Sequence, residues 1–454
     1  MKVQKKNELD MTRGSLLKQM IIFSVPLIIT NVFQLLYSAV DMIVVGRFAG
    51  AQALSAVGST GVLVNLVVMC FMGLSMGSGV VISRAFGARD RQTIQNTVHS
   101  SILLAIVGGI ILSILGLFLT RPLLVLVGTP ADVIDGATLY MQIFFIGTPF
   151  NLVYNFGASM LRAVGDTKRP LRILIVAGIV NLVLNLIFVI YYNMSVAGVA
   201  IATIISQAIS ALLVMRCLMT ASNDLHLDLK KLKMHKAEMK DIVKIGLPAG
   251  IQSSLFTISN VTVQSAVNSF GSIVIAGNAA GSNLEGFIFS SMSCVTQAII
   301  TSTGQNIGAQ QYKRVRKGLY HGIGLTLFLA AFWATLLYTL APILVALYNN
   351  DPEVIKIGVI RLQFMCIPYT LSGIMDNLTG YLRGRGYSFS PAVITLVFAC
   401  LLRVVWIAAV FPFHRTIMTI YWIYPISWVL TATTLTLLIY KVRKTLPMGD
   451  LQRV

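Results

Sequence analysis

The sequence predicts an all-α polytopic membrane protein with twelve transmembrane helices in two six-helix bundles. Three observations support this fold class: an apolar composition, apolar windows long enough to cross a bilayer, and an internal repeat. Of the 454 residues, 56% are hydrophobic and only 11% are charged, and the mean hydropathy is +0.80. A soluble domain has about 25% charged residues. We therefore expect most of this chain to lie in the membrane.

The predicted helices follow from windows of roughly 20 apolar residues, which is the length that crosses about 30 Å of hydrocarbon. In the first half of the chain these windows lie at 17–42, 54–80, 94–119, 137–160, 171–192 and 196–218. In the second half they lie at 243–270, 275–302, 319–347, 355–381, 391–411 and 417–440.

The two halves are diverged copies of one unit, offset by 221 to 222 positions. Identical residues set this offset, and they include the pairs Pro26 and Pro248, Phe48 and Phe270, Arg162 and Arg383, and Pro170 and Pro391. Because six helices is an even number, both copies enter the membrane from the same side. The pseudo-two-fold axis then runs along the membrane normal, as in transporters whose halves move around a central site.

The distribution of basic residues predicts the topology. Most Lys and Arg residues fall in the chain ends and in the loops after even-numbered helices, so the positive-inside rule places both termini in the cytoplasm. The predicted parts are a cytoplasmic tail at 1–16, bundles at 17–218 and 242–440, a cytoplasmic linker at 219–241 and a second tail at 441–454. We expect the lysine-rich linker to form an amphipathic surface helix.

Several functions are excluded at this point. The net charge of +19 follows from topology, so it does not indicate nucleic-acid binding. The five cysteines occur singly without CxxC spacing, which is typical of buried apolar residues. No P-loop motif and no catalytic motif such as HExxH occurs. We therefore predict neither an enzyme nor a cofactor, and any uphill transport must use an ion gradient.

Of the ionisable residues inside the apolar windows, we take four as candidates for a role in the membrane: Asp41, Glu285, Asp376 and Arg403. A charge in the membrane is costly, so such a residue is either paired or functional. Asp41 ends a polar stripe on the first helix, whose other members are Thr30, Gln34 and Tyr37. This stripe places a carboxylate on one face of the first bundle.

Two further helices of the first bundle carry oxygen ligands. Asn181 and Asn185 are an i, i+4 pair, while Thr203 and Gln207 share a face of the next helix. A carboxylate, amide oxygens and a hydroxyl suit a hard cation such as Na⁺. The same carboxylate could instead carry a proton, because desolvation disfavours its charged form. A third interpretation is a polar cluster that only packs the helices together.

The second bundle carries candidate cavity residues. Asn260 and Gln264 lie on the long polar stripe of the seventh helix, and such a stripe must face protein or water. Glu285 either pairs with Arg403 at a similar depth or faces the cavity and binds a cationic substrate. Asp376 either lines the cavity or pairs with Arg383.

Pro26 removes a hydrogen bond inside the first helix and should bend it. The bend is either a static packing feature or a hinge that reports ion binding.

Several stretches together resemble bacterial members of the multidrug and toxic compound extrusion (MATE) family. They are Gln-Leu-Leu-Tyr-Ser-Ala-Val-Asp-Met-Ile-Val-Val-Gly-Arg-Phe at 34–48, Ala-Leu-Ser-Ala-Val-Gly at 53–58, Leu-Arg-Ala-Val-Gly-Asp at 161–166, Asn-Leu-Glu-Gly-Phe at 283–287 and Pro-Tyr-Thr-Leu-Ser-Gly at 368–373. The resemblance covers nearly the whole chain, and it is specific in combination.

The resemblance implies a secondary antiporter that exports cationic, often aromatic drugs or metabolites in exchange for Na⁺ or H⁺ by alternating access. Its partners are then cationic small molecules and the lipid bilayer, without nucleic acid, and its location is the inner membrane of a bacterium. We expect it to act as a monomer.

The resemblance also implies an ion site. In the family branch that binds the ion in the first bundle, the matching positions are Asp41, Asn181, Asn185 and Thr203, and Pro26 is associated with bending of the first helix. Many relatives carry an acid where this chain has Asn185, which leaves the choice of ion open. The seventh helix has no carboxylate between 252 and 268, so an ion mechanism confined to the second bundle is disfavoured.

One alternative is a lipid-linked oligosaccharide flippase, because such proteins resemble the same fold superfamily. A flippase would need a basic groove for phosphate. The candidate cavity charges here are mostly acidic, which argues against it.

Overall fold

The structure, a computed structural model, describes residues 8–221 and 224–443. These residues form helices and connecting loops without any strand, so the predicted all-α class is confirmed. The first repeat contains α1 (Leu16–Val44), α2 (Gly50–Ala88), α3 (Arg91–Leu126), α4 (Ile134–Ala163), α5 (Lys168–Asn185) and α6 (Ser195–Met219). The second contains α7 (Lys236–Asn268), α8 (Ser272–Gly308), α9 (Tyr312–Ala346), α10 (Pro352–Met365), α11 (Tyr369–Gly384), α12 (Phe389–Thr395), α13 (Leu402–Ala409) and α14 (Ile417–Arg443).

Every predicted window contains a helix, although the number of membrane spans stays a prediction. In the described part of the chain, nine helices are long and apolar enough to cross a membrane. A tenth span results if α10 and α11, which meet at a bend of 49°, count as one. The helices α4 and α7 occupy two further windows without being among the nine.

Three short π-helical turns interrupt the helical pattern. They are η1 (Val45–Ala49), η2 (Leu186–Tyr191) and η4 (Leu396–Leu401). A π-helical turn adds one residue to a helical turn and is frequent at functional sites. Two of these turns lie close to predicted ion ligands, since η1 begins four residues after Asp41 and η2 follows Asn185 directly.

Contacts divide the described chain into two compact units. Unit 1 comprises residues 8–10 and 29–250, and unit 2 comprises Met11–Ile28 with residues 251–443. The divisions after Ile28 in α1 and after Gly250 in α7 lie at equivalent positions of the repeat. The first part of each repeat's first helix therefore belongs to the other unit. The predicted bundles at 17–218 and 242–440 describe the sequence repeat, and they remain predictions for the membrane domains.

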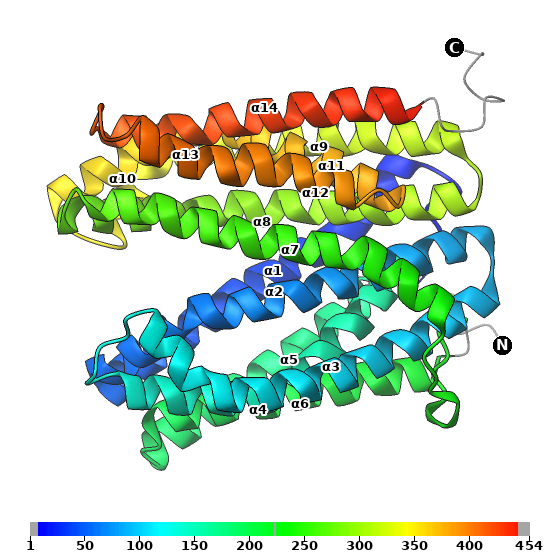
Figure 1. Cartoon of the computed structure of the whole chain (residues 1–454), viewed down its shortest axis with the longest axis horizontal. Helices are drawn as coiled ribbons and strands as arrows, with labels where there is room; N and C mark the ends of the chain where they lie inside the picture. The colour runs from blue at the N-terminus through cyan, green and yellow to red at the C-terminus, as the bar shows by residue number, and fades with distance from the viewer. Residues whose placement is uncertain (1–7, 222–223, 444–454) are drawn as a thin grey trace. The chain divides into compact units, whose positions relative to one another are not determined.

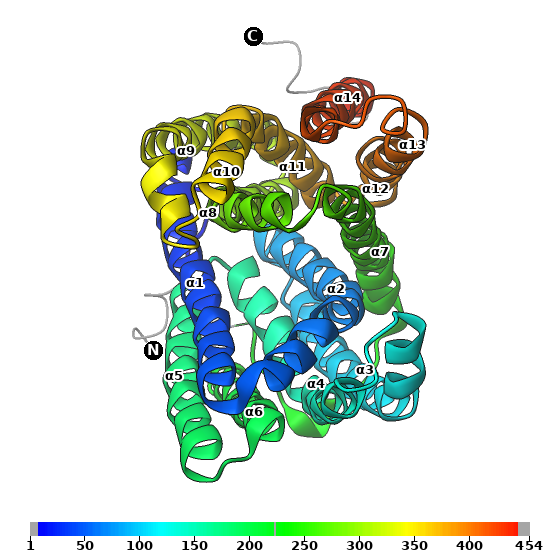
Figure 2. The ribbon, with the colours of Figure 1, turned by 90° about the vertical axis from the view of Figure 1, so that its left-hand side faces the viewer.

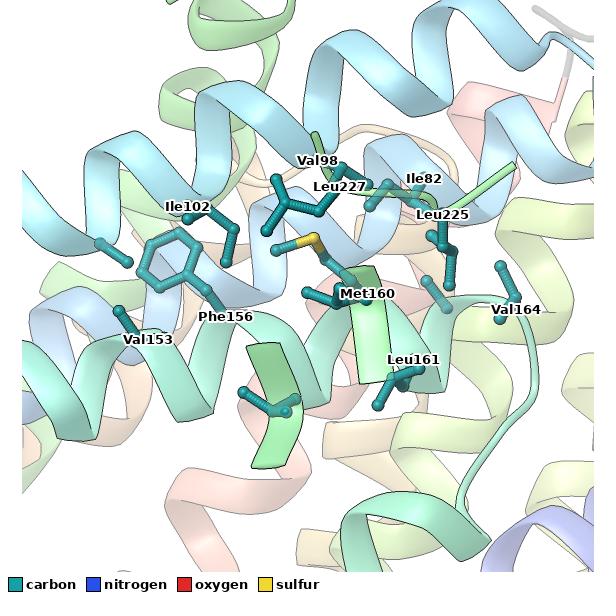
Figure 3. Close-up of a cluster of buried hydrophobic side chains, with 14 of the residues drawn as sticks. Ile82, Val98, Ile102, Val153, Phe156, Met160, Leu161, Val164, Leu225 and Leu227 are labelled. Carbon is teal, nitrogen blue, oxygen red and sulfur yellow. The ribbon is translucent and has the colours of Figure 1, made fainter. Parts of the chain in front are cut away.

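In unit 1, α3, α4 and α6 run side by side and α2 packs against α4 (Figures 1 and 2). Figure 3 shows the apolar core between them, where Phe156 and Met160 of α4 face Val98 and Ile102 of α3. At the start of α3, the Asp90 carboxylate accepts a hydrogen bond from the Thr93 backbone N–H at 3.1 Å. The hydrogen bond from the Thr93 hydroxyl, together with this N-cap bond, holds the pKa of Asp90 below its usual value.

The linker differs from the amphipathic helix that the sequence suggested. Its described part contains only the 3₁₀ turn η3 (Leu229–Lys231) before α7 begins. Leu225 and Leu227, two residues apart, are buried in the core of unit 1, which is the spacing of extended chain rather than of a helix (Figure 3). The Asp228 N–H also donates to His99 Nε2 at 3.2 Å. Burial of these leucines and the bond to α3 therefore outweigh the helical propensity of the lysine-rich segment.

Four glycines allow α2 to contact the first part of α7 within unit 1. A Cβ on Gly73 would lie 2.2 Å from the Gly250 nitrogen, and a Cβ on Gly77 would lie 2.4 Å from the Ile242 carbonyl oxygen. The partner positions Gly246 and Gly250 are also four residues apart. This is the small-xxx-small pattern that brings helix backbones together in membranes.

In unit 2, α8 is the central helix, and it packs against α9, α10 and α11 (Figure 2). The last helix, α14, packs against α11. The apolar core between α8 and α9 contains Leu284, Ile288 and Leu337, all buried.

Candidate cation and substrate site

Unit 1 contains an open cavity of about 840 Å³. Its walls come from α1, α2, α4, α5 and α6. Among the residues that line it are five of the predicted ones: Gln34, Asp41, Asn181, Thr203 and Gln207. Predicted ion ligands and predicted substrate-cavity residues of the first half therefore share one cavity.

The four predicted ion ligands form one hydrogen-bond network. Asn185 Nδ2 donates to Asp41 Oδ1 and also to Asn181 Oδ1, the latter at 2.8 Å. Asn181 Nδ2 donates to Thr203 Oγ1 at 3.4 Å, and the Thr203 hydroxyl donates to the Val199 carbonyl at 2.9 Å. This network of hydrogen bonds thus connects α1, α5 and α6 within unit 1.

Two buried acceptors beside this hydrogen-bond network have no partner among the described residues. Within that part of the chain, Asn185 Oδ1 and Gln207 Oε1 accept no hydrogen bond, although Asn185 is 0% exposed. A buried unsatisfied polar atom costs about 1–3 kcal/mol. The orientation of the Asn185 amide follows from its neighbours, because its nitrogen donates to two oxygens. The free oxygens, together with the Asp41 carboxylate and the Thr203 hydroxyl, are the hard ligands that Na⁺ accepts.

Local sequence explains how these side chains meet. Asn181 and Asn185 lie one helical turn apart on α5, so their side chains project from the same face. The π-helical turn η2 begins directly after Asn185, and η1 begins shortly after Asp41. These two turns contact each other.

Two further predicted residues belong to α1. Tyr37 belongs to α1, but its side chain falls outside the described residues. Pro26 is inside α1 in unit 2, two residues before the division at Ile28. Its predicted role as a hinge stays a prediction.

Glu285 is fully buried and forms a bidentate ion pair. Its partner is Arg361 rather than Arg403. Arg361 Nε donates to Oε1 at 2.9 Å and Nη2 donates to Oε2 at 2.7 Å. The predicted pairing of Glu285 with Arg403 is therefore wrong, because the Arg403 guanidinium donates to Ser427 and Asn260 instead. In the structure Arg361 lies on α10, and the stem of its side chain passes over Gly281 of α8, where a Cβ would come within 3.0 Å. The missing side chain at Gly281 therefore makes room for the pair.

The other predicted residues of the second half belong to local networks of unit 2. Asn260 Oδ1 accepts from Arg403 Nη1 at 3.1 Å, and Gln264 Nε2 donates to Asn268 Oδ1 at 2.9 Å. Asp376 lies seven residues before Arg383 on α11, and the two interact electrostatically. Contact of these residues with a substrate stays a prediction.

Sequence reasoning missed two asparagines of the cavity. Asn151 and Asn155 of α4 line it, and Asn155 Nδ2 donates to Asn151 Oδ1 at 2.8 Å. They show the same i, i+4 spacing that singled out Asn181 and Asn185. That spacing was the signal available in the sequence.

The fold and this site define a polytopic membrane transporter. The sequence profile of the MatE family matches residues 26–187 and 248–408, so each repeat matches the profile once and the predicted duplication is confirmed. The chain belongs to the MatE family, whose members are transporters and not enzymes.

Similar proteins described as multidrug resistance proteins support this family assignment. The probable multidrug resistance protein YpnP of Bacillus subtilis (strain 168) is 30% identical over 395 residues, which are 87% of this chain and 88% of the relative. The probable multidrug resistance protein NorM of Thermotoga maritima is 24% identical over 84% of this chain and 82% of its own.

Solved structures share the fold. One is an outward-facing multidrug resistance MATE family transporter of the MOP superfamily, with a TM-score of 0.89 at 20% identity over 97% of this chain and 99% of that chain. Another is a MOP superfamily transporter from Pyrococcus furiosus, with a TM-score of 0.90 over 97% and 98%. At 20% identity these likenesses concern the fold alone.

Proposed function

We propose that this protein is a multidrug efflux antiporter that exports cationic, often aromatic compounds in exchange for Na⁺ or H⁺ by alternating access. Relatives named as multidrug resistance proteins support the export of drugs. The observation that supports the cation coupling is the buried Asn185 oxygen, which accepts no hydrogen bond from the described residues. The amide nitrogen of the same residue donates to the Asp41 carboxylate.

The cavity of unit 1 suits this function in size and lining. A volume of about 840 Å³ lies within the range of small-molecule sites, which is about 300–1,000 Å³. Aromatic side chains on its wall include Phe33, Tyr140, Phe144 and Tyr154. Aromatic faces attract organic cations, and Asp41 adds the negative charge.

Coupling follows when ion and substrate depend on the same carboxylate. An external cation that binds at Asp41 neutralises the charge that holds a cationic substrate, so the affinity for the substrate falls and the substrate leaves. By thermodynamic reciprocity, the substrate must weaken cation binding by the same factor. The protein needs no cofactor for this cycle, because the ion gradient supplies the free energy.

The flippase alternative finds no support in the cavity. Its lining, among the described residues, includes the Asp41 carboxylate and no Lys, Arg or His. A lipid-linked phosphate needs basic ligands.

We propose that the protein acts as a monomer in the inner membrane of a bacterium, with both termini in the cytoplasm. The bacterial relatives and the positive-inside pattern support this location. A C-terminal reporter that becomes fluorescent only in the cytoplasm should be bright. A fusion protein that is inserted in the membrane but dark would contradict the proposed cytoplasmic C-terminus.

Reconstitution in liposomes tests the proposed antiport. We expect an imposed Na⁺ gradient or pH gradient to drive ethidium transport, and Asp41→Asn to abolish that transport. Asp135→Asn is the matched control, because Asp135 is an exposed residue that pairs with Arg121 at the surface, and it should transport like the unmodified protein. Gradient-driven transport that survives in Asp41→Asn would overturn the proposal.

A further inference from the structure

Unit 2 contains a buried cation, Arg403, that has no acidic partner among residues 8–221 and 224–443. Arg403 of α13 is 0% exposed. No carboxylate of the described chain forms an ion pair with it. An isolated charge in the membrane interior is costly, so its surroundings must stabilise the guanidinium in another way.

Aromatic faces and neutral oxygens surround this guanidinium. Its central carbon lies 4.6 Å from the ring centroid of Tyr424, 5.0 Å from that of Phe256 and 6.0 Å from that of Trp428. Nε and Nη2 donate to Ser427 Oγ at 3.3 and 3.2 Å, and Nη1 donates to Asn260 Oδ1 at 3.1 Å. Such a set of ring faces and acceptors is the environment that proteins use to bind organic cations. We call these five residues the Arg403 cage.

The Arg403 cage corresponds to the Asp41 network of unit 1. The cage joins α7, α13 and α14, which are the first, fifth and sixth spans of the second repeat. The Asp41 network joins α1, α5 and α6, which are the same spans of the first repeat. The fifth span of each repeat also carries a π-helical turn beside the cluster, because η4 ends two residues before Arg403.

The register of the repeat strengthens this correspondence. With the offset of 221 that relates Pro170 to Pro391, Thr203 matches Tyr424 and Ser206 matches Ser427. The same offset places Asn181 opposite Leu402, the residue next to Arg403. Equivalent places thus hold two different clusters. In unit 1 it is a carboxylate network whose Asn185 and Gln207 oxygens accept no hydrogen bond from the described residues, and in unit 2 it is a guanidinium that already donates to its acceptors.

We propose that the guanidinium of Arg403 permanently fills a cation position in unit 2. This position is equivalent to the exchangeable cation site of unit 1. This inference rests on the proposed cation site at Asp41. It follows that only unit 1 takes up a cation from solution. It also follows that removal of the Arg403 side chain opens a latent site for guanidinium and small alkylammonium ions.

Chemical rescue tests this inference with purified full-length protein. Arg403→Ala should lower the melting temperature by several degrees, and millimolar methylguanidinium chloride should restore at least half of that loss. Sodium chloride at the same ionic strength should restore none of it. The unmodified protein and Arg415→Ala, which removes an exposed arginine, should show no response to methylguanidinium. A folded Arg403→Ala protein whose melting temperature ignores methylguanidinium would overturn the proposal.

A second pair of variants keeps the proposal testable if Arg403→Ala fails to fold. Arg403→Lys keeps a cation in the cage, whereas Arg403→Met keeps a side chain of similar length without charge. We expect the Lys variant to melt at the higher temperature, and an equal or higher value for Met would contradict the proposal. Melting requires no transport, so normal transport by Asp41→Asn would defeat the proposed function without changing these results.

Discussion

Asn185 connects the two kinds of ligand in the candidate cation site. Its amide nitrogen bridges Asp41 and Asn181, while its buried carbonyl oxygen has no hydrogen-bond donor in the part of the chain that the structure describes. Such an oxygen is costly to bury unless something positive binds it during the functional cycle. The residue therefore contributes to the site by its carbonyl oxygen rather than by size alone.

Replacement of Asn185 tests this role. Asn185→Leu keeps similar volume and removes the oxygen, so we expect at least a tenfold loss of gradient-driven ethidium transport in liposomes. Asn185→Asp keeps an oxygen ligand and should retain coupled transport. If the Leu variant transports as fast as the unmodified protein, the Asn185 oxygen is not a cation ligand.

The buried pair of Glu285 and Arg361 should be required for stability. Glu285→Gln leaves the Arg361 guanidinium buried without its counter-charge, and breaking such a pair costs about 3–5 kcal/mol. Thermal unfolding in detergent should show this loss, and the double variant Glu285→Gln with Arg361→Met should recover part of it. Asp135→Asn breaks an exposed pair and should change the melting temperature little. An equally small change for Glu285→Gln would contradict the assigned pairing.

At the scale of helices, the contact between α2 and α7 depends on glycine. Gly73→Ala would place a methyl group in the backbone of α7, and overpacking of this kind costs about 1–3 kcal/mol. Gly61→Ala is a matched control on the same helix, since a Cβ there meets nothing within 4 Å. We expect a lower melting temperature for Gly73→Ala only. A Gly73→Ala protein as stable as the control would mean that the two backbones are further apart.

Pro26 precedes the point where α1 passes from unit 2 to unit 1. If this residue is a hinge, Pro26→Ala restores a helical hydrogen bond, stiffens α1 and slows transport several-fold. Na⁺ or H⁺ binding at Asp41 should persist, because Pro26 lies about four helical turns away along α1. Pro342→Ala in α9 is the control for a proline inside another helix. Unchanged transport in Pro26→Ala would leave the bend as a static feature.

The sequence predicts the site residues of some helices but not the packing partners of others. Helical spacing on α5 and α6 was sufficient to select Asn181, Asn185 and Thr203, because i, i+4 positions share a face in any helix. The partner of Glu285 was not accessible in this way, since it depends on how α10 packs over Gly281. The conformation of the linker is also not predictable from its lysines, because burial of Leu225 and Leu227 in the core of unit 1 is a tertiary effect.

For the whole molecule, the repeat was the most informative feature of the sequence. It predicted equivalent halves, and the family profile matches each of them once. It did not predict that α1 and α7 each divide between two compact units, because periodicity within a helix does not tell which neighbours it contacts. The same repeat relates a carboxylate cluster in unit 1 to an arginine cage in unit 2.

The central claim is that a cation bound at Asp41 moves in exchange for substrate. Its most direct test is the reverse flux: liposomes loaded with Na⁺ or buffered protons receive an opposing ethidium gradient, and cation movement is recorded. We predict cation flux opposite to ethidium flux in the unmodified protein and in Asp135→Asn, and none in Asp41→Asn. Ethidium flux in the unmodified protein without any counterflow of Na⁺ or H⁺, or equal counterflow in Asp41→Asn, would contradict the account.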